Sequence, residues 1–511
     1  MGMLAKTTTA TPWGVDARGV QVEVDVYNGL PQTQIVGLPD ASVRESRERV
    51  RSAIKNSGFS LPPRVVVVNL APADLRKEGN HLDLAIAVAL LAALGQVPTS
   101  AIEGRLLCGE LGLDGTVRPV RGGLAIADLA GRLGMRELIL PWQNAAEAAA
   151  LDALPVIPVR SFAEAVEHLL GQTVIEPQPK IALRDHETEE VPDLVDVRGQ
   201  DAAKRALEVA AAGGHNLLFI GPPGSGKTML ARRLPGILPP LNLAESIAVT
   251  KIHSLVSESP PSELLRRRPF RSPHPGVSTA GMIGGGTIPR PGEASLAHAG
   301  VLFLDELPEF RRDTLESLRQ PLEEGQVTVV RTRARLQFPA RFALLAAMNP
   351  CPCGHLGDSR HRCRCSPPAI ERYRSRISGP LLDRIDLHIE VPAVSLREFQ
   401  AVGGETSQAV AERVLKARRI AQQRFGNTST PINAALEKKD IDAYCVQEAD
   451  AKALLDTAYE RLGLSARAMT RILKVARTIA DLDDSENLRA PHIAEAIQYR
   501  SLDRRNNGGR S

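Results

Sequence analysis

The order of apolar and polar residues predicts a small α/β domain in the first third of the chain. Apolar and polar positions alternate over residues 20–26, which is the period-two pattern of a half-buried β-strand. A run of four valines at 65–68 suits a buried strand, and the long apolar run at 82–94 suits a helix. Strand and helix patterns recur between residues 106 and 169, so we expect a first domain at residues 1–170.

The remaining patterns predict a larger α/β domain and then a helical domain. Residues 171–194 are polar and rich in Pro and Glu without periodicity, which is typical of a linker. Strand and helix patterns alternate over 195–394, as in a parallel sheet covered by helices. Residues 395–503 have helical patterns, and we expect 504–511 to form a disordered tail. The helical runs of this last domain are 409–423, 449–462, 466–479 and 490–499.

Composition and charge narrow the range of partners. The 511 residues include 63 Lys and Arg against 59 Asp and Glu, so a nucleic-acid surface would have to be a local basic patch. Aromatic residues make up only 3%, which favours phosphate contacts over base stacking. The sequence contains no apolar run of about 18 residues and no apolar leader, so we expect a cytoplasmic protein with no membrane partner.

A phosphate-binding loop is the clearest chemical motif. It follows the apolar run 217–220 and precedes a helical pattern, which is the setting that this motif requires. In such a loop the glycines let backbone N–H groups surround phosphate oxygens, and the helix N-terminus adds a partial positive charge. We expect Lys227 to reach the β- and γ-phosphates of ATP and Thr228 to ligate Mg²⁺. The expected nucleotide-binding residues are Gly221, Pro222, Pro223, Gly224, Ser225, Gly226, Lys227 and Thr228.

Two further strands predict the hydrolytic groups. The apolar run 301–304 ends at Asp305 and Glu306, at the edge where open α/β sheets bind ligands. We expect Asp305 to hold Mg²⁺ through water and Glu306 to orient and polarise the attacking water. A third run, 342–348, ends at Asn349, whose amide is expected to position that water. An ordinary Asn-Pro turn at the strand end is the alternative.

Two arginines are candidates for the positive charge that phosphoryl transfer requires. Arg384 follows a short helical pattern, and an arginine from a neighbouring subunit accelerates hydrolysis by roughly 10³–10⁵. Arg467 opens a helix of the third domain, from which we expect it to reach the nucleotide across the domain boundary. Ordinary surface cations are the alternative for both residues.

Four further motifs accompany these residues: Val197-Arg198-Gly199-Gln200, Ile288-Pro289-Arg290-Pro291-Gly292-Glu293, Asn349-Pro350-Cys351-Pro352-Cys353-Gly354 and Ser378-Gly379-Pro380-Leu381-Leu382-Asp383-Arg384-Ile385-Asp386-Leu387. With these motifs, the sequence resembles the ComM/YifB family of magnesium-chelatase-like AAA+ proteins over nearly the whole chain. The resemblance implies a hexameric ring with nucleotide between subunits, Arg384 acting in trans and Arg467 sensing nucleotide from a helical lid. It also implies a DNA helicase that drives branch migration in homologous recombination, notably of DNA taken up in natural transformation.

The first domain resembles the ribosomal-S5-type fold that Lon protease and RadA share. The catalytic serine of Lon follows a Lys-Asp-Gly-Pro type of turn, and the corresponding run here, residues 77–83, has His81 at the serine position. Without that nucleophile we expect DNA binding or ring assembly rather than peptide hydrolysis. The expected fold class is α/β: an S5/Lon-like domain, a central AAA+ P-loop domain with a parallel sheet, and a helical lid.

Residues 325–342 predict a β-hairpin, which the resemblance places towards the pore of a ring. Arg331, Arg333 and Arg335 alternate there, and period two puts all three on one face of a strand. Guanidinium groups about 6.6 Å apart suit DNA phosphates, whereas the alternative is a charged edge strand that keeps the protein soluble. A solvated face explains a second basic cluster equally well; its members are Arg266, Arg267, Arg268 and Arg271.

Four of the six cysteines crowd into one polar loop in a C-x-C … C-x-C pattern. Four thiolates satisfy tetrahedral Zn²⁺, and a metal would give order to a loop that lacks an apolar core. His355 or His361 could replace one thiolate. Reduced cytosolic thiols or a redox-labile cluster are the alternatives. The four residues are Cys351, Cys353, Cys363 and Cys365.

The leading hypothesis is an ATPase that moves along DNA. The expected cofactors are ATP and Mg²⁺, with a structural Zn²⁺. The expected partners are single-stranded, forked or D-loop DNA, further copies of the chain in a homo-hexamer, and recombination proteins. One rival is a chelatase-type assistant that remodels a protein partner; the arginine row and the cysteine loop favour DNA. A second rival, an ATP-dependent protease, is disfavoured by His81.

Overall fold

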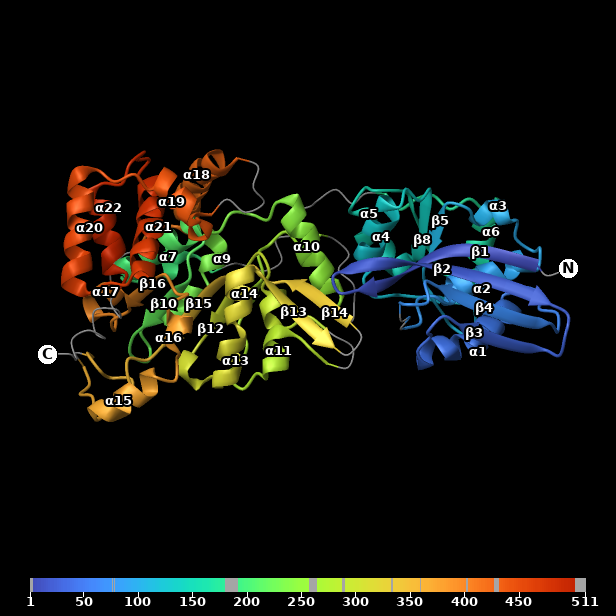
Figure 1. The fold of residues 1–511 in the computed structure, drawn as a ribbon, viewed down its shortest axis with the longest axis horizontal. Coiled ribbons are helices and arrows are strands. Elements are labelled where there is room, and N and C mark those ends of the chain that lie inside the picture. The colour runs from blue at the N-terminus through green and yellow to red at the C-terminus, as the bar shows by residue number, and fades with distance from the viewer. Residues whose placement is uncertain are drawn as a thin grey trace. The chain divides into compact units, whose positions relative to one another are not determined.

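The chain folds into two compact units (Figure 1). Unit 1 spans Met1–His186, Leu243–Leu265 and Val330–Phe338, and unit 2 spans Glu187–Asn242, Arg266–Val329 and Pro339–Ser511. The expected tail and residues 180–191 of the expected linker lie outside the described residues. The computed structural model describes residues 3–75, 77, 79–179, 192–256, 264–286, 290–331, 334–358, 360–400, 403–426 and 432–500.

Unit 1 is a mixed β-sheet with helices. Its strands are β1 (Met3–Trp13), β2 (Asp16–Tyr27), β3 (Gln32–Val36), β4 (Val65–Ala71), β5 (Arg105–Leu107), β6 (Glu110–Leu111), β7 (Val117–Arg118), β8 (Glu137–Pro141) and β9 (Val156–Val159). Its helices are α1 (Ala41–Asn56), α2 (Asp83–Ala93), α3 (Thr99–Ile102), α4 (Gly123–Arg132), α5 (Trp142–Ala149), α6 (Phe162–Leu169) and α10 (Leu243–Ser254).

The seven-stranded sheet of unit 1 has the order β3-β4-β2-β1-β5-β8-β9, while β6 and β7 pair separately. β2 is antiparallel to both β1 and β4, and the other neighbours in the large sheet run parallel. Val20, Val22, Val24 and Val26 of β2 are fully buried. The predicted alternation therefore decided which face of this strand meets the core, because a one-residue slip would expose every valine.

Unit 2 contains a parallel sheet, and the chain also forms a separate two-stranded hairpin. The sheet strands are β10 (Leu217–Ile220), β11 (Phe270–Arg271), β12 (Val301–Leu304), β15 (Ala343–Met348) and β16 (Leu387–Glu390), and the hairpin consists of β13 (Gln326–Arg331) and β14 (Ala334–Pro339). The sheet order is β11-β12-β15-β10-β16, and every pairing is parallel. The strand before the P-loop therefore lies inside the sheet, with the strand before Asn349 beside it.

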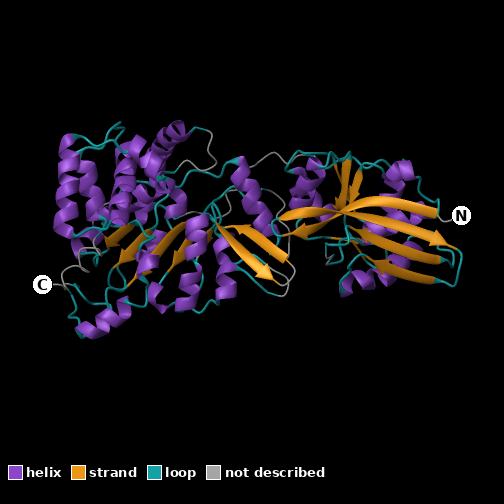
Figure 2. Cartoon of the chain, in the orientation of Figure 1, coloured by secondary structure: helices purple, strands orange, loops and turns teal. Residues whose placement is uncertain are grey.

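Helices lie along this sheet (Figure 2). Those of the nucleotide-binding region are α7 (Asp201–Gly213), α8 (Lys227–Ala231), α9 (Leu234–Ile237), α11 (Thr279–Ile283), α12 (Glu293–Leu296), α13 (Arg312–Ser317), α14 (Arg319–Glu324), α15 (Pro367–Arg374), α16 (Gly379–Leu382) and α17 (Leu396–Gln400). Those of the C-terminal region are α18 (Ser407–Phe425), α19 (Lys438–Tyr444), α20 (Ala449–Leu462), α21 (Ala466–Leu482) and α22 (Ala490–Gln498).

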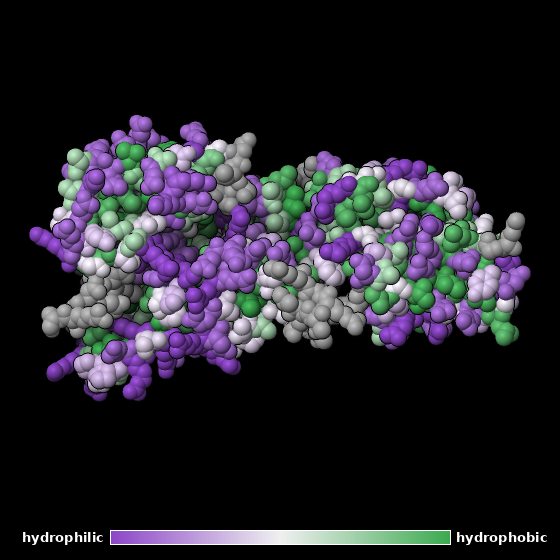
Figure 3. Space-filling model, viewed as in Figure 1, coloured by the Kyte–Doolittle hydropathy of each residue, from purple (hydrophilic) through white to green (hydrophobic). Residues whose placement is uncertain are grey.

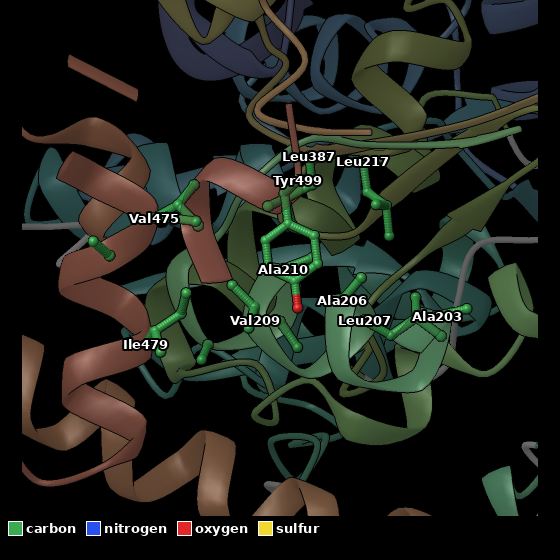
Figure 4. Close-up of a cluster of buried hydrophobic side chains, with 14 of the residues drawn as sticks. Ala203, Ala206, Leu207, Val209, Ala210, Leu217, Leu387, Val475, Ile479 and Tyr499 are labelled. Atoms are coloured by element: carbon green, nitrogen blue, oxygen red, sulfur yellow. The ribbon is translucent and has the colours of Figure 1, made fainter. Parts of the chain in front are cut away.

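One hydrophobic core joins the sheet of unit 2 to its C-terminal helices. Leu207 of α7, Leu217 of β10 and Leu387 of β16 pack in the same buried cluster as Val475 and Ile479 of α21 (Figure 4). All of these side chains are at most 1% exposed. Because the helical region completes this core, it is packed together with the sheet as one unit.

The face of unit 2 that Figure 3 shows is largely polar. Hydrophilic residues cover most of its visible face in Figure 3. Among the described residues, no helix combines the length and the hydropathy needed to cross a bilayer.

A buried ionic cluster lies inside the helical region. The Arg477 and Asp481 side chains of α21 are each only 1% exposed. The Asp481 carboxylate accepts hydrogen bonds from Arg477 at 3.1 Å, from Arg424 of α18 at 3.0 Å and from Asn433 at 2.8 Å. The negative charge of Asp481 thus balances the positive charges of two guanidinium groups that are largely buried.

We expect Asp481→Ala to destabilise unit 2 by about 3–5 kcal/mol, because removing one partner of a buried ion pair leaves the other charge uncompensated. Urea denaturation followed by far-UV circular dichroism measures the change. Asp456→Ala removes the same charge from an exposed position on α20 and should change stability by less than about 0.5 kcal/mol. Equal losses in the two variants would contradict the proposed role of the cluster.

Candidate nucleotide site and metal-binding loop

The phosphate-binding loop, residues 221–228, joins β10 to α8. Gly224 and Gly226 adopt φ values of +73° and +91°, which side-chain-bearing residues rarely tolerate. A side chain at Gly221 would collide with the backbone carbonyl of Val391. These glycines are therefore required by the path of the loop, and that path brings its backbone towards the N-terminus of α8.

Lys227 is the first residue of α8 and is only 8% exposed. Its ammonium donates hydrogen bonds to the carbonyls of Gly221 and Pro222, both at 2.8 Å, and lies 3.3 Å from Oδ1 of Asn349. Burial lowers the pKa of Lys227, while the charges of Asp305 and Glu306 act in the opposite direction. The ammonium group of Lys227 thus contacts both the P-loop and Asn349 at the end of β15.

The acidic pair lies at the end of β12. The Thr228 hydroxyl donates a 2.7 Å hydrogen bond to Oδ2 of Asp305, so the two expected Mg²⁺ ligands are already adjacent. Glu306 is exposed and adopts the left-handed φ of +52°. A hydroxyl and a carboxylate oxygen fit the hard-oxygen chemistry of Mg²⁺, so these two residues could hold the ion.

Arg384 lies at the amino-terminal ends of the strands of the same sheet, whereas the P-loop lies at their carboxyl ends. β16 runs parallel to β10, with Leu387 paired to Leu217 and Glu390 to Ile220. Because Arg384 precedes β16, roughly 13 Å of strand separates its backbone from the P-loop. Its carbonyl accepts a 2.7 Å hydrogen bond from Asn216, the residue before β10. Arg384 therefore does not meet the nucleotide site of its own chain.

The Arg384 guanidinium lies among other charges. It forms an ion pair with Glu323 and donates to the carbonyl of Pro380 at 2.5 Å. Its Nε is buried and has no hydrogen-bond partner among the described residues. Burial lowers the pKa of Arg384, and the neighbouring cations Arg319, Arg471 and Arg467 lower it further.

Arg467 lies beside Arg384 rather than beside the P-loop. It is the second residue of α21, is 80% exposed, and lies 3.6 Å from Oδ2 of Asp383. The expectation that Arg467 reaches a nucleotide across the domain boundary stays a prediction. Packing of α21 against the sheet brings its N-terminus to the edge that carries Arg384.

The loop after β15 contacts the P-loop. Gly354 adopts a φ of +84°, and a Cβ added there would lie 2.7 Å from Cδ and 2.9 Å from Cγ of Pro223. This contact was not predicted, because residues 223 and 354 are far apart in sequence. The cysteine loop therefore rests directly on the loop expected to hold phosphate.

The four loop cysteines converge. Sγ of Cys351 lies 3.4 Å from that of Cys353 and 3.6 Å from that of Cys363, and the Cys353–Cys363 separation is 3.7 Å. The Cys365 sulfur belongs to the same group, within 4.8 Å of the others. A tetrahedron with Zn–S bonds of about 2.3 Å has edges of about 3.8 Å. The residues therefore fit a structural Zn²⁺ with four thiolates, which would order the loop.

His355 and His361 do not join the sulfurs. Each presents Nδ1 to the same oxygen of Asp358, at 2.9 Å and 3.3 Å. The alternative in which a histidine replaces a thiolate is thus not needed for a four-ligand set. Asp358 was not singled out from the sequence, although the spacing His-x₂-Asp-x₂-His was available as a signal.

The expected arginine row does not lie on one strand. Arg331 ends β13, Arg335 belongs to β14, and Arg333 lies outside the described residues. Arg331 and Arg335 belong to different strands, so the expectation of three arginines on one face of one strand is corrected. In the second basic cluster, Arg268 donates to the carbonyl of Pro239 at 2.6 Å and Arg271 pairs with Glu293 at 2.7 Å. The side chains of these two arginines are thus bound to other groups of the same chain.

His81 of unit 1 is buried at the position expected for the Lon serine. Burial lowers its pKa to about 4, so the imidazole is neutral near pH 7. Its Nε2 has no hydrogen-bond partner within the described part of the chain. Lys77, also buried, donates to the carbonyl of Pro72. A buried neutral imidazole lacks the hydroxyl that an acyl-forming serine would provide.

Three family models match the chain. The model described as magnesium chelatase, subunit ChlI, matches residues 193–399, and the model of the ChlI C-terminal region matches residues 404–500. A third model, described as subunit ChlI of Mg-chelatase, matches residues 22–144.

Several proteins are similar over nearly their full length. YifB of Salmonella typhimurium is 46% identical over 510 residues, and competence protein ComM of Haemophilus influenzae is 46% identical over 504 residues; each match covers 98% of both chains. Lon protease 2 of Bacillus subtilis is 23% identical over 158 residues, which is 30% of this chain and 28% of that protein. With the parallel sheet and helical C-terminal region, these similarities confirm the predicted fold class.

We expect Gly354→Ala to weaken ATP binding roughly tenfold, or about 1.4 kcal/mol, because its Cβ would lie 2.7 Å from Cδ of Pro223 and would displace the P-loop. Titration with a fluorescent ATP analogue measures the affinity. Gly357→Ala is the matched control, since Gly357 has a φ of +81° in the same loop but nothing within 4 Å of an added Cβ. Equal effects of both substitutions would show that strain, and not contact with the P-loop, is responsible.

Proposed function

The chain belongs to the ComM/YifB family of magnesium-chelatase-like AAA+ proteins, and from this premise we propose that it is an ATP-hydrolysing DNA motor. Family membership implies ATP and Mg²⁺ as ligands. The observation that carries the proposed hydrolysis is the convergence of three neighbouring strand ends. Lys227 lies within hydrogen-bond distance of Asn349, and Thr228 lies within hydrogen-bond distance of Asp305.

The proposed roles follow from what each group can do at that edge. Thr228 and Asp305 would hold Mg²⁺, which supplies charge neutralisation on the phosphate oxygens. Lys227 binds the β- and γ-phosphates, and Asn349 beside it orients the attacking water. Glu306, exposed at the end of β12, accepts the proton of that water. The N–H groups of residues 221–228 hold the phosphate oxygens.

The position of Arg384 supports a site shared between copies of the chain. Arg384 and Arg467 lie together at the edge of the sheet away from their own P-loop, so they serve a nucleotide bound by a neighbouring copy. Head-to-tail contacts of this kind close into rings, and we propose a hexamer. The two arginines then supply positive charge as the γ-phosphate leaves.

DNA is the proposed substrate of the motor. The basic residues near the tip of the β13–β14 hairpin suit phosphate contacts. The Haemophilus influenzae relative is named a competence protein, which favours a role with DNA taken up in natural transformation. The activity that we propose is helicase and branch-migration work on single-stranded, forked or D-loop DNA in the cytoplasm, alongside recombination proteins. The rival function, remodelling of a protein partner, would leave ATP turnover indifferent to DNA.

We expect DNA to stimulate ATP turnover of the wild-type chain, and Lys227→Ala to abolish turnover.

Substituting Arg331, Arg333 and Arg335 with Ala should weaken DNA binding and reduce the slope of log K against log salt by roughly 2–3, because each phosphate contact contributes about 0.9. Fluorescence anisotropy over a salt series measures both. Substituting Arg419, Lys438 and Lys452, three exposed cations on the helical region, provides the control of equal charge. Unchanged affinity in the hairpin variant would count against the hairpin.

We expect Arg384→Ala and Glu306→Gln each to lose at least roughly 10²-fold in turnover, because each removes a group that acts in the transition state. Mixing the two after subunit exchange should restore activity, since roughly one quarter of the head-to-tail interfaces then carry both intact groups. Glu306→Gln mixed with Lys227→Ala should recover nothing, because both changes lie on the same side of the interface. Failure of the first mixture to recover, with mixed rings verified by tags, would refute action in trans.

A further inference from the structure

A second cluster of metal-ligating side chains lies between the two C-x-C pairs. The Asp358 side chain is 4% exposed, whereas those of His355 and His361 are 31% and 66% exposed. Both imidazoles turn Nδ1 towards Oδ2 of Asp358, and the ring centroids are 4.8 Å apart. One nitrogen or oxygen atom from each residue lies within 4.8 Å of those of the other two.

We propose that His355, Asp358 and His361 bind a divalent transition-metal ion at a site separate from the four thiolates. Metal–nitrogen and metal–oxygen bonds of about 2.0–2.2 Å give ligand-to-ligand distances of about 2.9–3.5 Å in octahedral or tetrahedral geometry. The observed separations, 2.9 Å and 3.3 Å, fall in this range. Small rotations of the side chains would bring all three donors onto one ion.

The surroundings fit such a site. Oδ1 of Asp358 accepts a 2.9 Å hydrogen bond from the backbone N–H of Arg360, which orients the carboxylate and leaves Oδ2 facing the histidines. Hydrogen bonds of this kind hold metal ligands in position. The exposure of His361 leaves the outer side of the cluster open to water, so three protein ligands leave coordination positions free for water or an oxygen ligand.

The loop also needs a source of order. Among the described residues of 352–366, no apolar side chain is buried. Hydrophobic packing therefore does not hold the segment between the cysteine pairs. The four sulfurs can fix its two ends, whereas the histidines and Asp358 lie in its middle, where a second ion would fix the remainder.

The ligand types indicate which ions fit. Two imidazoles and one carboxylate suit Zn²⁺, Fe²⁺, Ni²⁺ or Co²⁺, whereas Mg²⁺ and Ca²⁺ prefer oxygen ligands alone. The alternative is a metal-free turn in which both imidazoles donate hydrogen bonds to Asp358. The two arrangements differ in the number of metal ions per chain, which is measurable without ATP or DNA and independently of the proposed function.

The test is titration of the full-length, reduced and chelator-treated chain with Co²⁺, followed by absorption. Thiolate ligands give strong charge-transfer bands, and a site of imidazole and carboxylate gives only weak d–d bands. We expect two equivalents of Co²⁺ in the wild type. His361→Gln should lose the equivalent with weak bands and keep the thiolate bands, whereas Cys353→Ser with Cys363→Ser should lose the thiolate bands and keep the other equivalent.

His274→Gln, which changes an exposed histidine elsewhere in the chain, should bind two equivalents like the wild type. Because His361 is largely exposed, His361→Gln is expected to fold, and Asp358→Asn provides a second variant that should also lose one equivalent. Far-UV circular dichroism verifies folding in each case. A single equivalent with thiolate bands in the wild type, or two equivalents in both His361→Gln and Asp358→Asn, would overturn the proposal.

Discussion

Parallel pairing of β12, β15 and β10 is the constraint on which the rest of the nucleotide site depends. Hydrogen bonding fixes the register so that three neighbouring strands end at one edge of the sheet. Each strand is apolar and largely buried, and each is followed directly by a residue of the site: Gly221 of the P-loop, Asp305 and Asn349. The Lys227–Asn349 and Thr228–Asp305 contacts follow from this arrangement, because the carboxyl ends of parallel strands share an edge.

The same register places the P-loop and Arg384 at opposite ends of the strands. β16 is parallel to β10, so a residue before β16 must lie at the other edge from the P-loop. Asn216 fixes this edge: its side chain donates to the carbonyl of Arg384 at 2.7 Å and accepts from the N–H of Leu344 at 2.8 Å. From the helical region, Arg500 donates to the carbonyl of Ile385 at 2.8 Å. Strand edges and C-terminal helices thus hold the segment of Arg384 together.

The loop after β15 gives the nucleotide site a second support. The strand that carries Asn349 continues directly into the cysteine loop, and Gly354 returns to contact Pro223. Arg374 of α15, beyond the cysteines, donates to the carbonyl of Pro350 at 3.1 Å. Because no apolar side chain is buried among the described residues of 352–366, the conformation of this segment depends on its polar clusters. A metal ion that orders this loop would therefore also restrict the conformation of the P-loop, which the loop contacts.

Local patterns in the sequence determined the elements and the chemistry that each carries. The apolar runs before Gly221, Asp305 and Asn349 specify buried strands, and the periodic runs of the last hundred residues specify the helices, because burial and periodicity act over a few neighbouring residues. What required the tertiary structure was every contact across long stretches of chain. Arg467 meets Asp383 only because α21 packs on the sheet. Arg331 and Arg335 belong to two different strands of a hairpin, and a period-two pattern does not show where one strand ends and the next begins.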